Sequence, residues 1–321
     1  MRSGILFVVM IVCMHTYAHA NDNWKQQTEN ANFIHRAVKQ VTDVMVHDIY
    51  SPPVASRTYA YLSIAAYEAL AAGDSSYRSL AGQLKDLKAL PGPEQGKEYS
   101  YTVAAVHAVL AIGKALVISE QSIDAFVQSI TQELKQSGIP AATFDNSVAF
   151  GQQVAKHIMD WASRDQYKQT RTFTKYAVTD VAAYWKPTPP AYMRAVEPHW
   201  NKIRTFVLDS ARQFPPAPPT AFSPEKDSPF FKEAMAVHEV GLKLTQEQKD
   251  IANFWDCNPF KMNVSGHVMY ASKKISPGGH WMNINRLACQ KTNASPVQSV
   301  EAYALLAITI ADAFISCWDE K

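Results

Sequence analysis

The sequence predicts an all-α protein, built either as a single helical domain or as two packed bundles. Three observations point to this class. Apolar residues recur at steps of three or four in most segments, which is the period of a helix with one buried face. No segment shows a convincing strand-like alternation, and no repeat of fixed period is present. With 321 residues, 47% of them hydrophobic, the chain can bury a sizeable core.

Five helices are predicted in the first half of the chain. The first has a regular apolar face and is ended by Ser51-Pro52-Pro53. The second is rich in alanine and tyrosine, which implies close packing, and the third is apolar on all faces and should be buried. Thr143 or Asp145 is expected to cap the fifth. The predicted helices span residues 29–50, 54–72, 100–118, 119–136 and 147–163, with a loop or short helix at 80–97.

A segment rich in proline and aromatic residues follows, at about residues 165–228. Ten of the 18 prolines lie between Pro187 and Pro229. Aromatic side chains alternate with them, whereas a solvated linker would be poor in aromatics. We therefore expect an ordered insertion that wraps around the helices and packs on them.

Further helices are expected at residues 229–240, 245–256 and about 280–289, before a last helix at 295–321. Ser295 is a good N-cap and Pro296 suits the first turn. No glycine, asparagine or proline provides an ending for this helix. Its predicted apolar face consists of Val300, Tyr303, Leu306, Ile310, Phe314 and Trp318.

Residues 1–20 have the pattern of an export signal. Arg2 supplies a positive start, an apolar run follows, and Ala18-His19-Ala20 fits a cleavage site. The apolar run is too short to span a bilayer comfortably, so no stable membrane anchor is expected after cleavage. The predicted product is a helical domain of residues 21–321, located in the periplasm or outside the cell.

Charge and cysteine content exclude several classes. The 31 basic and 29 acidic residues nearly balance, which argues against nucleic acid as a partner. Three cysteines remain after residue 20, namely Cys257, Cys289 and Cys317. They allow at most one disulfide and match no CxxC metal pattern, so we expect core thiols.

Two glycine–histidine sequences are candidates for anion binding: Ser265-Gly266-His267 and Gly278-Gly279-His280. Small residues beside a histidine can direct backbone N–H groups and an imidazole at an anion. An ordinary turn is the alternative for each. His238, Asp256 and Glu301 could join these histidines in a metal site, but no tight ligand spacing is present, and we expect no metal. A serine hydrolase is disfavoured, because there is no GxSxG motif and an all-helical pattern provides no strand–turn–helix elbow for the serine.

Basic residues offer a third kind of anion site. Lys168, Arg171 and Lys175 are spaced to share one helical face, either as an anion site or as a solvated surface. Lys321 follows Trp318 on a helix whose other face is buried. On spacing alone it is a lysine at a frayed helix end whose stem lies along apolar surface.

The segment ADAFISCWDEK, residues 311–321, resembles the part of vanadium-dependent haloperoxidases that carries their first oxyanion-binding lysine. Those enzymes share a helical core and an active site with type 2 phosphatidic acid phosphatases. Two longer stretches, residues 184–214 and 254–284, are similar to the bacterial secreted branch of that superfamily. The resemblance covers most of the chain after residue 20. It implies a helical bundle in which Lys321 binds an oxyanion cofactor, vanadate, and Trp318 is an aromatic near the halide pocket.

The rest of the family pattern is not found. The superfamily site reads K-x6-R-P, then P-S-G-H, then S-R-x5-H, so that lysine and arginines hold the oxyanion and histidines bind it or transfer protons. This sequence has no Arg-Pro dipeptide. Ser265-Gly266-His267 lacks the preceding proline and lies before the lysine, where the family has it after. The resemblance therefore implies an N-terminal portion, truncated at its first site residue, that binds no vanadate by itself.

The function that the resemblance implies is oxidation of a halide by peroxide at bound vanadate, with a small organic substrate. This chain is expected to be inactive alone, to need a C-terminal half, whether separately encoded or not, and to expose apolar surface on its last helix. One alternative is hydrolysis of a phosphate ester by the same kind of site. Another is a non-catalytic helical binding module.

Overall fold

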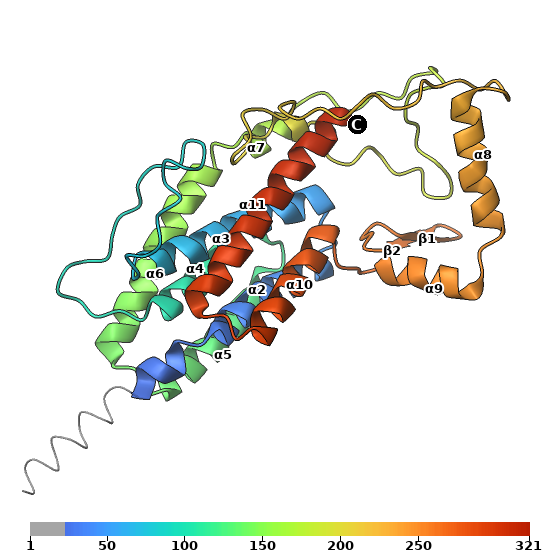
Figure 1. The fold of residues 1–321 in the computed structure, drawn as a ribbon. Coiled ribbons are helices and arrows are strands. Elements are labelled where there is room, and N and C mark those ends of the chain that lie inside the picture. Colours follow the sequence, from blue (N-terminus) through green and yellow to red (C-terminus); the bar gives the residue numbers. More distant parts are fainter. Residues whose placement is uncertain (1–22) are drawn as a thin grey trace, which may run out of the picture.

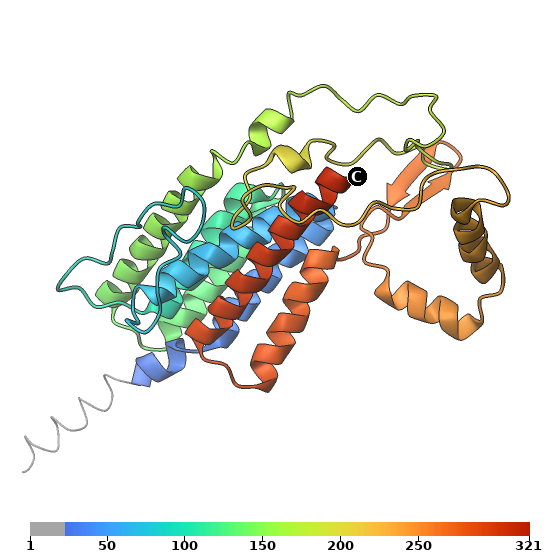
Figure 2. The same cartoon turned by 45° about the horizontal axis from the view of Figure 1, so that its top comes forward.

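Most helices lie side by side in one bundle, and two of them stand away from it with a small hairpin (Figures 1 and 2). The structure is a computed structural model and describes residues 23–321. The predicted export signal at residues 1–20 lies outside the described part. The helical class is confirmed, because helices account for nearly all of the regular structure described.

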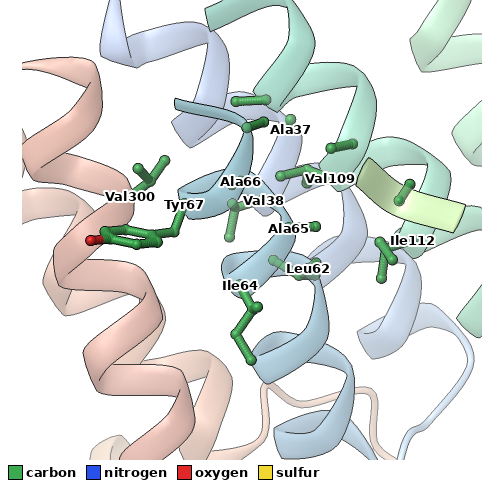
Figure 3. Packing of buried hydrophobic residues seen from close by; sticks show 14 of the residues in the cluster. Ala37, Val38, Leu62, Ile64, Ala65, Ala66, Tyr67, Val109, Ile112 and Val300 are labelled. Atoms are coloured by element: carbon green, nitrogen blue, oxygen red, sulfur yellow. The ribbon is translucent and has the colours of Figure 1, made fainter. Parts of the chain in front are cut away.

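Helix α3 (Pro52–Ala71) lies at the centre of the bundle, where nearly all of its side chains are buried. Its alanines allow α4 (Tyr101–Leu116), α6 (Ala141–Ala162) and α11 (Pro296–Glu320) to approach closely, as the composition predicted. Figure 3 shows Tyr67 of α3 beside Val300 of α11, while Val109 and Ile112 of α4 lie on the other side of α3. The prediction that α4 is buried is also confirmed.

Helix α2 (Ala31–His47) covers this core together with α5 (Glu120–Gln136). The predicted apolar face of α2 is confirmed, and the Asn30 side chain caps the helix by accepting a hydrogen bond from the Asn32 N–H. Residues 73–100 form the predicted loop rather than a helix.

Helix α6 begins six residues before the prediction, at Ala141, with Pro140 in the N-cap position. The predicted caps are therefore wrong. Thr143 lies inside the first turn, where its hydroxyl donates to the Glu98 carboxylate and its carbonyl accepts from Ser147. Further along, α6 crosses α4 at Gly151, where an added Cβ would collide with the Ala104 carbonyl. Glycine is required here for the close crossing of two helices.

The proline- and aromatic-rich segment packs on the bundle through a short part only. Trp200, Ile203 and Phe206 are buried around the 3₁₀ turn η1 (Trp200–Lys202). By contrast, Tyr184, Trp185 and several other rings of this segment are exposed. The predicted packing is thus wrong for most of residues 172–199 and 212–225, because their side chains are largely exposed.

We call residues 229–271 the arm. It contains α8 (Pro229–Leu242), α9 (Gln246–Trp255) and an antiparallel hairpin of β1 (Met262–Ser265) and β2 (Val268–Ala271). Both views show α8 and α9 away from the bundle (Figures 1 and 2). The two helices were predicted within two residues, but the hairpin was missed because its strands are only four residues long.

Helix α10 (Pro277–Lys291) leads back to the bundle and starts three residues earlier than predicted. Ser276 caps it by accepting from the Gly279 N–H at 3.2 Å. A Cβ on Gly279 would lie 2.7 Å from the Tyr59 hydroxyl oxygen, so this glycine lets α10 reach α3.

Helix α11 is the one described helix long and apolar enough to cross a membrane by length and composition, but it lies against α3 and α10. Its Ser295 and Gln298 form a capping box. The predicted buried face is only partly correct. Val300 and Tyr303 are buried, but further along the buried positions are Ala304, Ala307, Ala311 and Ile315 and not Leu306, Ile310 or Phe314. Leu305 is exposed.

Candidate oxyanion site at the end of the last helix

Lys321 directly follows α11 and remains attached to it, since its backbone N–H donates to the Cys317 carbonyl at 3.2 Å. Its Nζ lies 4.2 Å from the centre of the Trp318 ring, a cation–π contact. The ring is itself fixed, because Trp318 Nε1 donates to the Val196 carbonyl at 2.9 Å. The lysine is exposed, so its position depends on this tryptophan.

Asp319 ties the same helix end to the preceding segment. Its carboxylate accepts from Asn201 Nδ2 and from Arg212 Nε, each at 2.7 Å. The hydrogen bond from Asn201, assisted by Arg212, lowers the pKa of Asp319 below its usual range. Arg212 is thereby paired with a carboxylate and is not free to bind another anion.

Two turns earlier, the buried Asp312 holds a stretch of backbone. Its carboxylate accepts from the N–H groups of Phe206, Val207 and Leu208 at 2.7, 2.8 and 3.0 Å. Three N–H donors around one carboxylate resemble the way a helix N-terminus holds an anion. Here the anion is part of the protein, so the arrangement is structural.

A buried network supports this stretch from behind. Asp165 Oδ2 accepts from Arg57 Nε at 2.6 Å and from the Tyr61 hydroxyl at 2.8 Å. Arg204 donates to the Tyr61 oxygen at 3.2 Å and lies 4.3 Å from the centre of the Trp161 ring. Burial, and then the charge of Asp165, raises the pKa of Tyr61 well above its usual value. Arg57 and Arg204 are thus both engaged in contacts that stabilise the fold.

The residues around Lys321 do not fit vanadate on their own. An oxyanion site needs several convergent donors, and Lys321 supplies one ammonium group. The end of a helix carries partial negative charge, which disfavours an anion there. Asp319 already pairs with Arg212, so this arginine adds no net positive charge at the helix end. The helix end can place one cation, but it cannot hold a multiply charged oxyanion without further groups.

Comparison with solved structures identifies the family. The chain is similar to a crystal structure described as that of the first bacterial vanadium-dependent iodoperoxidase, with 45% identity and a TM-score of 0.84. The match covers 91% of this chain and 69% of that one. This chain belongs to the vanadium haloperoxidase superfamily. No protein-family model matches the sequence, and no curated protein matches it.

The two glycine–histidine sequences that were predicted as anion sites have structural roles in this chain. Gly266 and His267 are the two loop residues of the hairpin, with Ser265 paired to Val268. Gly266 has φ +58°, which suits the glycine of a two-residue hairpin turn. The turn interpretation of this sequence is therefore confirmed.

Gly278-Gly279-His280 is the first turn of α10 and not a loop. His280 Nδ1 lies 3.0 Å from Cys257 Sγ, and its ring stacks on Trp255 with centres 5.4 Å apart. Asp256 pairs with Lys274, and the hydrogen bond from this lysine lowers the pKa of Asp256. These contacts attach the arm to α10. Across residues 23–321, no three His, Cys, Asp or Glu side chains gather as a metal would require.

The predicted basic face of Lys168, Arg171 and Lys175 does not form. Helix α7 (Tyr167–Thr170) has only four residues and ends before Lys175. Arg171 is instead paired with Glu197 at 2.9 Å. The three cysteines of the described part are unpaired. Cys289 is buried as expected, whereas Cys317 is exposed, so the expectation of core thiols is wrong for Cys317.

Sequence reasoning missed the groups that shape the helix end, namely Arg57, Asp165, Arg204 and Asp312. Two of them carried a readable signal. Asp312 interrupts the apolar run of the last helix, and Arg57 interrupts the alanine-rich run of the second predicted helix. A charge within a buried face needs a partner, so each could have been identified as half of a polar network.

An open cleft of about 730 Å³ lies elsewhere, between the start of α2 and the start of α11. Its lining includes Asn30, Asn293 and Ser295. Since α11 has 25 residues and rises about 1.5 Å per residue, this cleft is roughly 35 Å from Lys321. The cleft and the candidate oxyanion site are therefore separate.

Proposed function

We propose that this chain forms the structural part of a vanadium-dependent haloperoxidase, an enzyme that oxidises a halide with peroxide at bound vanadate. The observation that carries the proposal is the match to the bacterial iodoperoxidase, with 45% identity over 91% of the chain. Iodide is the halide in that protein's description, and it is the halide we propose here. The helical scaffold is the part of the enzyme that these residues supply.

Vanadate binding requires more than these residues in our proposal. Lys321 contributes one ammonium group, placed by Trp318, and further arginine and histidine side chains come from polypeptide that is not among the 321 residues. A separately encoded half is one source and additional sequence in the same chain is another. We propose that the chain alone neither binds vanadate nor oxidises iodide.

The test measures iodide oxidation by hydrogen peroxide, with and without vanadate. The 321-residue chain alone should show no vanadate-dependent rate. The chain joined to the iodoperoxidase residues that have no counterpart in it should show one. In that assembled protein, Lys321→Ala should lower the rate by about 100-fold, as loss of one oxyanion donor does. Lys291→Ala, at the exposed end of α10, is the matched control and should have no effect.

Two results would count against the proposal. Vanadate-dependent oxidation by the 321-residue chain alone would show that its own residues complete the site. Hydrolysis of a phosphate ester by the assembled protein, without iodide oxidation, would favour the phosphatase alternative. Export is a separate proposal from residues 1–20, tested by finding whether the exported protein begins near Asn21.

A further inference from the structure

A cavity of about 410 Å³ lies within the proline- and aromatic-rich segment. This volume falls in the range of small-molecule sites in proteins, which is about 300–1,000 Å³. All of its lining residues belong to that segment, in two stretches at residues 175–187 and 194–198. The cavity is therefore distinct from the cleft at the start of α11.

Two aromatic rings form one corner of the cavity. The Tyr176 and Trp185 rings meet edge to face with centres 5.7 Å apart, and the Tyr176 hydroxyl donates to the Trp185 carbonyl at 3.0 Å. These contacts fix both rings, yet Trp185 is 49% exposed and Tyr176 is 40% exposed. Val178 and Pro187 extend the apolar wall. Fixed rings that the protein leaves partly open suit a flat apolar ligand.

Two cations line the same cavity without a carboxylate. Lys175 and Arg194 are among the lining residues, and no acidic residue is. Glu197 is close in sequence but is paired with Arg171 at 2.9 Å. Within the described part of the chain, neither lysine nor arginine of this cavity has an ion pair or a side-chain hydrogen bond. The unbalanced positive charge suits a carboxylate, which arginine can bind through two parallel hydrogen bonds.

A hydrogen bond holds the two stretches of the wall together. His199 Nε2 donates to the Thr174 carbonyl at 2.6 Å. Thr174 immediately precedes Lys175, and His199 immediately follows Pro198. The walls of the cavity are thus joined by a contact that does not occupy it.

The cavity adjoins the candidate oxyanion site. Trp318 Nε1 donates to the Val196 carbonyl at 2.9 Å, and Val196 directly follows Ala195 of the cavity wall. Lys321 Nζ lies 4.2 Å from the centre of the same Trp318 ring. One tryptophan therefore contacts both the stretch that forms the wall and the lysine.

We propose that this cavity binds an aromatic carboxylate. The ring of the ligand packs on Tyr176 and Trp185, and its carboxylate pairs with Arg194 and Lys175. An inorganic anion would leave the two rings uncovered, and a neutral aromatic molecule would leave the two cations unpaired. The role of the ligand rests on the proposed function: a phenolic carboxylate is the organic molecule that the enzyme iodinates.

The iodination balances with the reactants already named. Iodide, hydrogen peroxide and a proton give hypoiodous acid and water. An electron-rich ring carbon of the phenolic carboxylate then bonds to iodine while the iodine–oxygen bond breaks. Hydroxide leaves and takes up the proton of that ring carbon, forming water. The iodine is reduced by two electrons and the ring is oxidised by two, so no further oxidant is needed.

The test titrates 4-hydroxybenzoate into the 321-residue chain and measures binding by calorimetry. The Kd should lie below about 1 mM, and phenol and acetate should each bind about 10-fold more weakly, since each lacks one half of the ligand. Arg194→Gln combined with Lys175→Gln should weaken binding of 4-hydroxybenzoate by about 10-fold. Trp185→Leu should weaken it by about 5-fold.

Lys249→Gln combined with Lys291→Gln is the matched control, because it removes the same charge from exposed positions outside the cavity. It should leave the Kd unchanged. The substituted side chains are all exposed, and circular dichroism checks that each variant is folded. Absence of binding at about 10 mM 4-hydroxybenzoate would overturn the proposal. Equal weakening by the control pair would do so too, as would equally tight binding of inorganic phosphate.

A second measurement separates this site from the proposed function. In the assembled protein, the rate of iodination of 4-hydroxybenzoate relative to phenol should fall about 10-fold in the Arg194→Gln, Lys175→Gln variant. Binding to the chain without any iodide oxidation by the assembled protein would support the site and refute the function. Iodide oxidation without binding of 4-hydroxybenzoate would support the function and refute the site.

Discussion

Single carboxylates determine how the end of α11 is held. Asp312 satisfies three backbone N–H groups at residues 206–208, and Asp319 joins Asn201 to Arg212. None of these contacts is local in sequence. They fix the position from which Trp318 and Lys321 extend.

Asp312→Ala should destabilise the protein by about 2–4 kcal/mol, because three buried or partly buried N–H groups would lose their acceptor. Urea unfolding measures the loss. Asp124→Ala removes an exposed pair with Lys114 and should cost less than about 1 kcal/mol. Equal losses for the two variants would show that the Asp312 contacts contribute nothing special.

Two buried histidines should make stability depend on pH. Burial lowers the pKa of His107 to about 4, and burial together with Arg286 lowers that of His35 to about 4. Both are neutral in the folded protein, whereas the unfolded chain binds protons below about pH 6.5. Their contribution is complete above that pH and is lost as the pH falls toward 4, by up to about 3 kcal/mol for each.

Unfolding measurements between pH 7 and pH 4.5 test this dependence. His107→Leu should reduce the loss of stability over that interval, since leucine cannot take up a proton. His267→Gln changes an exposed histidine in the hairpin turn and should leave the loss unchanged. The prediction fails if His107→Leu loses as much stability as the unaltered protein.

For single residues, sequence reasoning identified Lys321 but not the groups that surround it. Lys321 and Trp318 were identified through a resemblance, and the structure adds that the lysine lies over the tryptophan ring. Asp165 and Arg57 are 108 residues apart in sequence. No local pattern could pair them, because their contact exists only once α3 and α6 have packed.

Among the elements, close approach between helices depends on glycine at specific places. Gly151→Ala should destabilise the protein by about 1–3 kcal/mol, because the new Cβ would collide with the Ala104 carbonyl of α4. Gly241→Ala lies in the exposed helix α8 with nothing within 4 Å of the added atom. It should not destabilise the protein, since alanine favours helix by about 1 kcal/mol. Thermal unfolding and circular dichroism of the two variants provide the comparison.

Helix positions were predictable because apolar period and caps are local signals. The buried side of α11 was harder to predict. The larger residues Leu306, Ile310 and Phe314 suggested one face, yet the alanines at 304, 307 and 311 are the more buried set. Helix α3 is itself rich in alanine, so contact between the two is closest where both side chains are small. The size of the side chains on the facing helix decides which face of α11 is buried. The sequence of α11 alone does not contain that information.

Across the whole molecule, stability should be unevenly distributed. Backbone N–H groups of α8 and α9 in the chain alone should exchange with solvent at least 100-fold faster than those of α3 and α4. The reason is that local opening of α8 or α9 exposes no buried side chain, whereas opening of α3 disrupts the core. Hydrogen exchange with mass spectrometry measures these exchange rates directly. Equal protection of arm and bundle would contradict it.

The class, the helix order and the family were accessible from the sequence, and the arrangement in space was not. The arm illustrates the limit. Its helices were predicted within two residues, but periodicity says only that a face is apolar and not what covers it. Similarly, exposed rings such as Tyr184 and Trp185 were expected to pack because aromatic residues usually do.

The spacing of Asp312 and Asp319 has a consequence for the length of α11. Seven residues make almost two full turns, so both carboxylates emerge on the same side and reach residues 201–212. Inserting one residue between them would rotate Asp319 by about 100° and move it away from Asn201. The number of residues in this interval is thus constrained more tightly than their identity, so related sequences should vary in composition here without changing in length.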